Sequence, residues 1–180
     1  AAEARDTLRA GADKISMNSI FADNPNQVQN IINEVGRQAV VGSVDVKKVA
    51  GIPQVFTHQG RRRHSHRLNQ WVEYLLSNGV GELYFNSIDR DGTGQGYDHT
   101  LLEDLPTDIS VPVILAGGAG KSEHFVQALT DARVDAVATG HLLNFVGDGL
   151  VRARQKVLQS GLDVPAWDPT LVSALRGVLK

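Results

Sequence analysis

Cysteine is absent from this 180-residue sequence, and so are long apolar runs. Without cysteine the chain can form neither a disulfide framework nor a thiolate metal site. No apolar run approaches the roughly 20 residues that a membrane-spanning helix needs, so no membrane contact is expected. Residues 1–6 lack the apolar segment of a signal peptide, which makes the cytoplasm the expected compartment.

An excess of charge of either sign is also missing. The chain carries 18 Lys and Arg against 20 Asp and Glu, a net charge of −2. Such a balance gives no electrostatic basis for binding nucleic acid. The six histidines show no metal-ligand spacing, and we expect neither a metal nor a cofactor. The length and the 42% hydrophobic content suit one globular domain with a substantial core.

Short apolar segments alternate with amphipathic helical patterns. We expect strands at residues 13–18, 39–46, 82–87, 112–116 and 134–138, and helices at 1–10, 23–36, 68–78, 100–105, 122–129, 150–160 and 168–179. Residues 47–58 indicate a hairpin that turns at Ala50 and Gly51, residues 60–67 a charged loop, and Ser122 a helix cap. The alternation predicts βαβ units and a parallel sheet.

Polar residues follow each predicted strand. They are Asn18, Asp45, Asp89 with Asp91, Gly117 with Gly118, and Gly140 with His141. Polar groups after every strand fit a (βα) barrel, whose active face is built from the loops after the strands. An open sheet would gather its ligand at one switch point instead, and no G-x-G-x-x-G motif follows the first strand.

Five motifs occur in order along residues 1–161: Gly-Ala-Asp-Lys-Ile-Ser-Met-Asn at 11–18, Val44-Asp45, Asn-Ser-Ile-Asp-Arg-Asp-Gly-Thr at 86–93, Gly-Tyr-Asp at 96–98, and Ala-Gly-Gly-Ala-Gly-Lys at 116–121 with Glu-His-Phe at 123–125. With these motifs the sequence resembles the cyclase subunit of imidazole glycerol phosphate synthase, a (βα)8 TIM barrel of the ribulose-phosphate-binding type in histidine biosynthesis.

The resemblance implies a reaction and a partner. Ammonia made by a partner glutaminase subunit passes along the barrel and attacks a bisphosphorylated ribulosyl aminoimidazole substrate. A barrel of this class takes about 250 residues, so five βα units would form only part of one. We therefore expect this chain to be the C-terminal part of a longer protein. Residues 1–161 would be the family-like portion and 162–180 an added helical segment.

The resemblance also assigns roles. Asp45 matches one of the family's two acid/base aspartates, the other of which would lie upstream, and Asp91 would act near the substrate while Asp89 braces the loop. The expected phosphate or substrate contacts are Asn18, Ser19, Asn86, Gly92, Gly117, Gly118, Gly140 and His141. At the opposite end Lys14 and Glu82 would line the point where ammonia enters, and Asp13 and Gln38 would meet the glutaminase.

Other readings of the same residues stay open. Asp45 would be structural if it paired with Lys47 or Lys48, and the glycines would be structural if they only turn the chain. The arginines at 61–63 and 67 either form a solvated loop or bind an anion.

Several departures also resemble a paralogue that delivers ammonia to an amidotransferase acting on nucleotide-linked sugars for surface polysaccharide. They are Gly42 and Ser43, Asn86, and the segments 61–66, 141–144 and 168–180. A third reading is a non-catalytic docking or ammonia-conduit module.

Overall fold

The computed structural model describes residues 1–140, 142 and 149–165; His141 and the helix expected at 168–179 lie outside these described residues. Its strands are β1 (Ile15–Met17), β2 (Val40–Val49), β3 (Ile52–Thr57), β4 (Arg62–Arg63), β5 (Glu82–Ser87), β6 (Val113–Ala116) and β7 (Ala136–Val137). Its α-helices are α1 (Ala2–Arg9), α2 (Ile20–Asp23), α3 (Pro25–Val35), α4 (Leu68–Ser77), α5 (Ser122–Leu129) and α7 (Gly149–Gln159). Two 3-10 helices, η1 (Arg37–Ala39) and η2 (His99–Asp104), complete the described elements.

Five strands form a parallel sheet in chain order. β1 pairs with β2, β2 with β5, β5 with β6, and β6 with β7, all in parallel. These are the five strands that the sequence predicts, although β1 and β7 are shorter than expected and β2 extends further, to Val49. Within the described residues β7 pairs only with β6, so the strands do not close on themselves. The architecture is therefore a partial (βα) barrel.

An antiparallel hairpin extends this sheet. β2 continues beyond its pairing with β1 and turns back at Ala50 and Gly51, both with positive φ, into β3. The expected hairpin is thereby confirmed. The expectation of a loop throughout 60–67 is wrong in part, because Arg62 and Arg63 pair with the free edge of β3.

Local signals place most helix ends correctly. The side chain of Asn24 accepts a hydrogen bond from Gln27 N at the start of α3, and Gly36 ends that helix with a φ of 82°. The prediction that Ser122 caps α5 is wrong. Lys121 occupies the cap position, and Ser122 is the first helical residue. The helix expected at 100–105 is the 3-10 helix η2, whose start is capped by the Asp98 side chain.

The two faces of the sheet differ in what covers them. On one face Val44, Leu83 and Phe85 are fully buried, and Gly42 lies against Leu75 of α4. On the other face Asp45, Tyr84 and Asn86 are only half-buried.

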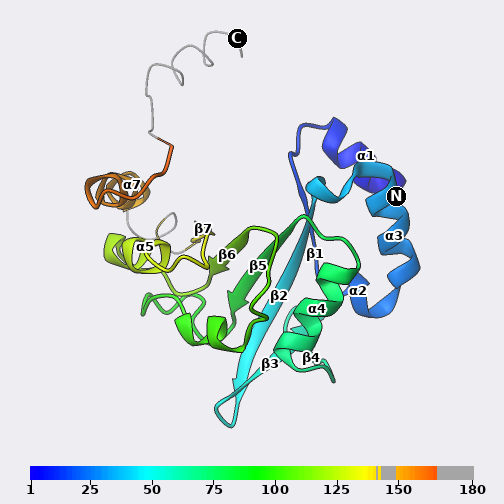
Figure 1. The fold of residues 1–180 in the computed structure, drawn as a ribbon, viewed down its shortest axis with the longest axis horizontal. Helices are drawn as coiled ribbons and strands as arrows, with labels where there is room; N and C mark the ends of the chain where they lie inside the picture. The colour runs from blue at the N-terminus through cyan, green and yellow to red at the C-terminus, as the bar shows by residue number, and fades with distance from the viewer. Residues whose placement is uncertain (141, 143–148, 166–180) are drawn as a thin grey trace.

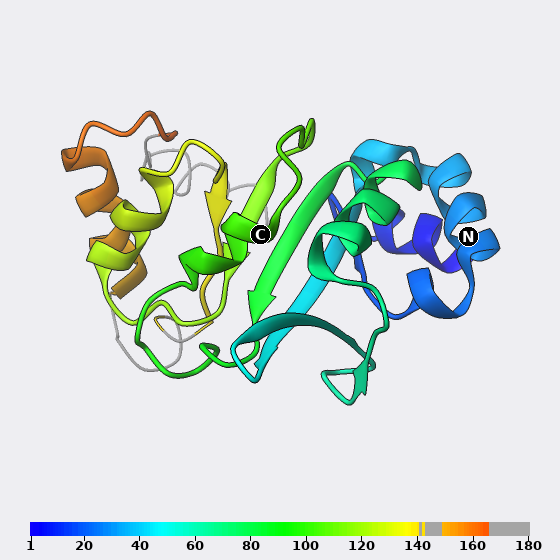
Figure 2. The same ribbon diagram turned by 60° about the horizontal axis from the view of Figure 1, so that its bottom comes forward.

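The helices are arranged along the sheet as in a barrel wall. Figure 1 shows α1 near β1 with α3 beside α1, α4 near β2 and β3, and α5 near β7 with α7 beside α5. Figure 2 shows the same grouping from another direction. No described helix is long and apolar enough to cross a membrane.

Candidate active site

Three neighbouring strands bring an aspartate and two asparagines together. Asp45 on β2 and Asn86 on β5 are register partners, and Asn18 directly follows β1 on the other side of β2. Asn18 Nδ2 donates to Asp45 Oδ2 over 3.0 Å, and Asn86 Nδ2 donates to Asp45 Oδ1 over 3.3 Å. Asn18 Oδ1 is buried and accepts no hydrogen bond from the part of the chain that the structure describes. The two asparagines thus hold the Asp45 carboxyl group from both sides.

The surroundings of Asp45 favour its protonated form. Burial of the carboxyl group raises the pKa of Asp45, the hydrogen bond from Asn86 lowers it, and the negative charge of nearby Asp91 raises it, with a net increase. A carboxyl group whose pKa moves towards neutrality is suited to exchange protons with a substrate. The alternative pairing with Lys47 or Lys48 is not the one observed, because the side chain of Lys48 bonds Asp98 and Thr100.

The loop after β5 carries Asp91 and is braced from β2. Asp91 is exposed, and its N–H donates to Ser87 O over 2.9 Å. Asp89 accepts a hydrogen bond from Lys48 N over 2.7 Å, which is the bracing role expected of it. Gly92 is exposed and has a φ of 74°, a left-handed conformation that favours glycine. Asp91 and Gly92 therefore lie at the same end of the sheet as Asp45.

Sequence reasoning missed a charged network beneath this loop. Lys48 Nζ lies 2.8 Å from Asp98 Oδ2 and donates to Thr100 Oγ1 over 2.6 Å. Asp98 is 5% exposed. Burial acts to raise its pKa, but the hydrogen bonds from Lys48 and Thr100 hold the pKa of Asp98 below its ordinary value. The D-x-T spacing of Asp98 and Thr100 is typical of the cap at the start of a helix. Nothing in the sequence, however, links these two residues to Lys48, fifty residues earlier.

We expect Lys48→Met to destabilise the protein by about 1.5–3 kcal/mol, the usual worth of a hydrogen bond to a charged group. Because folding lowers the pKa of Asp98, its contribution to stability is fully present above the unfolded-state pKa of the carboxyl group. That contribution is lost as the pH falls through the folded-state pKa. Urea unfolding at pH 7 would measure how much free energy of unfolding Lys48→Met loses relative to wild type. The same measurement at acid pH should show a smaller loss. Lys47→Met on the exposed neighbour is the control; equal effects from the two variants would contradict the network.

Glycine is required where the loop after β6 packs on the loop after β5. A Cβ atom on Gly117 would lie 2.6 Å from Ser87 O and 2.9 Å from Asn86 Oδ1. The N–H of Gly96 donates to Gly118 O over 2.7 Å. Both Gly117 and Gly118 are buried with positive φ. Their close backbone packing accounts for these glycines structurally, and it places Gly117 beside Asn86.

Ser19 is tied to the hairpin that extends β2. Ser19 Oγ accepts a hydrogen bond from His58 N over 2.7 Å, and the His58 ring bridges Asp23 and Thr57. His58, Gln59 and Gly60 all have left-handed φ values, and a Cβ atom on Gly60 would meet Ile88 of the β5 loop. The turn between β3 and β4 therefore lies close to both Ser19 and Ile88.

The remaining candidates lie apart from this cluster or outside the described residues. Gly140 is exposed with no atom within 4 Å of an added Cβ, and His141 is not described. The arginine segment is exposed; Arg62 pairs with Asp23, and Arg63 donates to Gln54. Among the described residues no three His, Asp or Glu side chains gather to hold a metal ion.

The opposite end of the sheet carries the predicted pair. Lys14 Nζ forms an ion pair with Glu82 Oε1, although the two residues lie 68 positions apart. Asp13 and Gln38 are exposed and precede β1 and β2 respectively. All four residues sit where the strands begin, which separates them from Asp45 by the length of the sheet.

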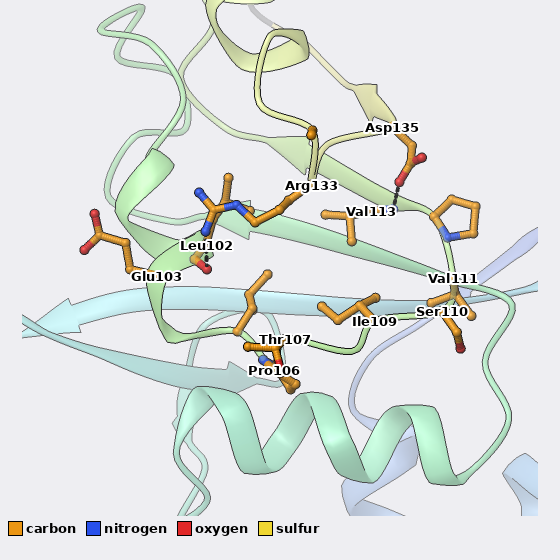
Figure 3. Close-up of a pocket in the computed structure, with 13 residues that line it drawn as sticks. Leu102, Glu103, Pro106, Thr107, Ile109, Ser110, Val111, Val113, Arg133 and Asp135 are labelled. Atoms are coloured by element: carbon orange, nitrogen blue, oxygen red, sulfur yellow. Dashed lines mark hydrogen bonds between the residues drawn. The ribbon is translucent and has the colours of Figure 1, made fainter.

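A cavity of about 690 Å³ lies elsewhere, near the starts of β6 and β7 (Figure 3). Two of its charged side chains, Asp135 and Arg133, are already engaged within the protein. Asp135 Oδ2 accepts from Val113 N over 2.8 Å, and Arg133 binds Asp131 and Leu102 O. Much of the remaining lining is apolar, including Ile109 and Val111. The chemistry-bearing residues gather at the other end of the strands, so we assign the candidate site there.

Parallel βα units with a carboxylate–amide row towards the carboxyl ends of the strands define a protein with a partial (βα)-barrel fold. The sequence model described as "Histidine biosynthesis protein" matches residues 1–147. The chain belongs to this family.

Two curated relatives are named imidazole glycerol phosphate synthase subunit HisF. The protein from Chlorobaculum tepidum is 35% identical over 161 residues, and that from Chlorobium phaeobacteroides is 34% identical over 161 residues. Each alignment covers 89% of this chain and 64% of the relative. A protein of Parasynechococcus marenigrum, provisionally named as subunit hisF2, is 38% identical over 166 residues, which is 92% of this chain and 62% of that protein. The chain thus spans somewhat under two thirds of the length of these relatives.

Proposed function

We propose that this chain forms the substrate-side C-terminal part of an ammonia-dependent cyclase, the cyclase subunit of imidazole glycerol phosphate synthase. The observation that carries the proposal is Asp45, held between Asn18 and Asn86 with a raised pKa at the end of a buried strand. The HisF names of its relatives support the same assignment. The substrate is the bisphosphorylated ribulosyl aminoimidazole carboxamide ribotide, and the nitrogen comes from a glutaminase subunit.

The site residues have distinct tasks in this proposal. Asp45 exchanges the proton that ring closure requires, and the two asparagines fix the direction of its carboxyl group. Asp91 raises the proton affinity of Asp45 and lies at the exposed rim, where a substrate group can reach it. Asn18, Ser19, Asn86, Gly92, Gly117, Gly118, Gly140 and His141 contact the substrate or its phosphates. Backbone N–H groups of glycine loops suit that contact because an anion can approach them closely.

In the same proposal, ammonia enters at the end of the sheet where the strands begin. The Lys14–Glu82 ion pair marks the point where ammonia enters, and Asp13 and Gln38 form part of the rim on which the glutaminase docks. In this proposal, nitrogen supply and chemistry lie at opposite ends of the same strands.

The test is turnover by the natural protein that contains this chain, supplied with the ribulosyl substrate and an ammonium salt. Appearance of imidazole glycerol phosphate together with the carboxamide ribotide is the expected result. A preparation that is folded, binds its glutaminase and yet forms no product would contradict the proposal.

A second candidate is supported by specific departures. Gly42 and Ser43, Asn86 and the segment 61–66 favour a paralogue that passes ammonia to an amidotransferase acting on nucleotide-linked sugars. In that case the ribulosyl substrate would remain unchanged, whereas glutamine hydrolysis would support amidation of a nucleotide sugar when the amidotransferase is added. A non-catalytic docking or conduit module would show partner binding and neither turnover.

A further inference from the structure

The hairpin that continues from β2 concentrates positive charge. Residues 46–67 hold six of the 18 Lys and Arg residues and none of the 20 Asp and Glu residues, which leaves 12 cations against all 20 acids in the rest of the chain. We call residues 46–67, which include β3 and β4, the basic hairpin. A segment of one sign in an otherwise acidic protein creates a positive potential over the surface around it.

Several of these cations have no acidic partner. The side chains of Lys47 and Arg61 are exposed and form no hydrogen bond or ion pair with any residue that the structure describes. Arg63 Nε donates to Gln54 Oε1, an uncharged group, over 3.0 Å. Arg62 meets only an exposed carboxylate, at 3.7 Å, and exposed pairs of this kind contribute little. The charge of the basic hairpin is therefore largely available to a ligand.

The register of the strands places two of the cations near Asp45. Lys47 follows Asp45 by two residues on β2, so both side chains lie on the same face of the strand. Arg63 is paired with Phe56, which is itself the partner of Asp45. Neighbouring strands are about 4.8 Å apart, so about 10 Å separates the backbones of Asp45 and Arg63.

The turn that carries Arg61 contacts the loops on both sides of β2. His58 N donates to Ser19 Oγ over 2.7 Å, and a Cβ atom on Gly60 would lie 3.4 Å from Ile88 Cδ1. These two loops follow β1 and β5, the parallel neighbours of β2. The pairing of β2 with β5 ends at residue 46, and Figure 1 shows the hairpin projecting beyond the end of β5. The basic hairpin therefore borders the candidate site.

A bisphosphorylated substrate would meet acids at this site. Asp45 and Asp91 lie at the same end of the sheet, and the chain as a whole is negative, so a ligand with several negative charges is repelled from a distance. Cations without acidic partners beside the site oppose that repulsion. Fields of this kind raise rates of association by about 10- to 10³-fold, and the gain falls steeply as salt is added.

We propose that the basic hairpin steers the bisphosphorylated substrate towards Asp45, and that Lys47, Arg61 and Arg63 provide the attraction. The inference rests on the proposed function, which supplies the substrate. The hairpin has a task distinct from that of the glycine loops, because its cations accelerate the encounter, whereas the glycine loops hold the phosphates of the bound substrate.

The test measures kcat/KM for the ribulosyl substrate in the natural protein at a constant, saturating concentration of ammonium. The variants are Lys47→Gln, Arg61→Gln and Arg63→Gln, singly and combined. Arg37→Gln is the matched control, because Arg37 is also exposed but precedes β2, at the other end of that strand. Potassium chloride raises the ionic strength from about 0.1 M to about 1 M, which shortens the Debye length from about 10 Å to about 3 Å. Stopped-flow binding without ammonium gives the association and dissociation rates of the substrate.

At the lowest salt concentration we expect each single variant to lower kcat/KM about two- to threefold and the combined variant to lower it about tenfold. The value of kcat should change less than about twofold, because the bound state is unaffected. The association rate should fall in parallel while the dissociation rate stays near that of wild type. All these losses should disappear near 1 M salt, and Arg37→Gln should behave as wild type throughout.

An unchanged kcat/KM in the combined variant at low salt would overturn the inference. A loss that persists undiminished at 1 M salt would also overturn it, because such a loss is structural. If only the glutamine-dependent activity fell, the hairpin would bind the glutaminase and not attract the substrate. The single variants keep the test decisive if the combined variant does not fold. Failure of the proposed function would be seen separately, as absence of ammonium-dependent turnover in wild type, and the stopped-flow rates would still test the hairpin.

Discussion

Asp45→Asn is expected to lower ammonium-dependent turnover about 100-fold or more, since loss of a positioned acid/base group usually costs 10²–10⁴-fold. Asparagine keeps the size of the side chain and can still bond Asn18 and Asn86, but it cannot exchange a proton. Steady-state kinetics of the natural protein with the ribulosyl substrate would measure the effect. Asp104→Asn, at an exposed acid on η2, is the matched control and should retain turnover.

The same substitution should leave stability intact. Because the folded state raises the pKa of Asp45, its contribution to stability is fully present below the unfolded-state pKa and is lost as the pH rises through the folded-state pKa. Asp45→Asn should therefore be as stable as wild type at pH 7, or slightly more stable, and the difference should shrink below about pH 4. A variant that unfolds, or one that turns over within a few-fold of wild type, would show that Asp45 is structural.

Asp13→Lys is expected to reduce glutamine-dependent activity by about tenfold or more while ammonium-dependent activity survives. Asp13 is exposed at the rim from which β1 begins, next to the Lys14–Glu82 ion pair. A charge reversal inside a docking surface places like charges together, which costs several kcal/mol and also slows association. Both activities would be measured in the natural protein together with its glutaminase.

Glu73→Lys provides the control for that reversal, because Glu73 is exposed on α4 at the outside of the sheet. It makes the same change of charge away from the proposed rim. If Asp13→Lys reduced both activities equally, it would be acting on folding or chemistry. If it reduced neither, the glutaminase would dock elsewhere.

The parallel core could be predicted from the sequence because its signals are local. Runs such as residues 82–87 alternate with helical stripes, and Asn24–Pro25 and Gly36 mark the ends of a helix. The two-residue strand β4 could not be predicted, since Arg62 and Arg63 pair only because β3 offers a free edge. The cap at Ser122 was misassigned by one residue, which is the usual uncertainty of helix ends.

The proximity of three predicted site residues follows from strand order, whereas their roles stay predictions. Parallel strands deliver Asn18, Asp45 and Asn86 to one edge, so their meeting follows from the topology. The Lys48–Asp98 ion pair and the Lys48–Thr100 hydrogen bond depend on side chains from segments far apart in the sequence. No local pattern encodes those contacts, and for Gly117 the structure adds a packing reason that the motif alone does not reveal.

The central claim is that Asp45 acts as a proton-exchanging group in an ammonia-dependent cyclisation. Its most direct test is the pH dependence of kcat for the ribulosyl substrate, measured in the natural protein at a constant concentration of free ammonia. We expect the pH profile of wild type to contain a limb governed by a carboxyl group whose pKa lies above the ordinary aspartate value of about 3.9, and we expect this limb to be absent from the residual activity of Asp45→Asn. An identical pH profile for the two proteins, or no imidazole glycerol phosphate at any pH, would contradict it.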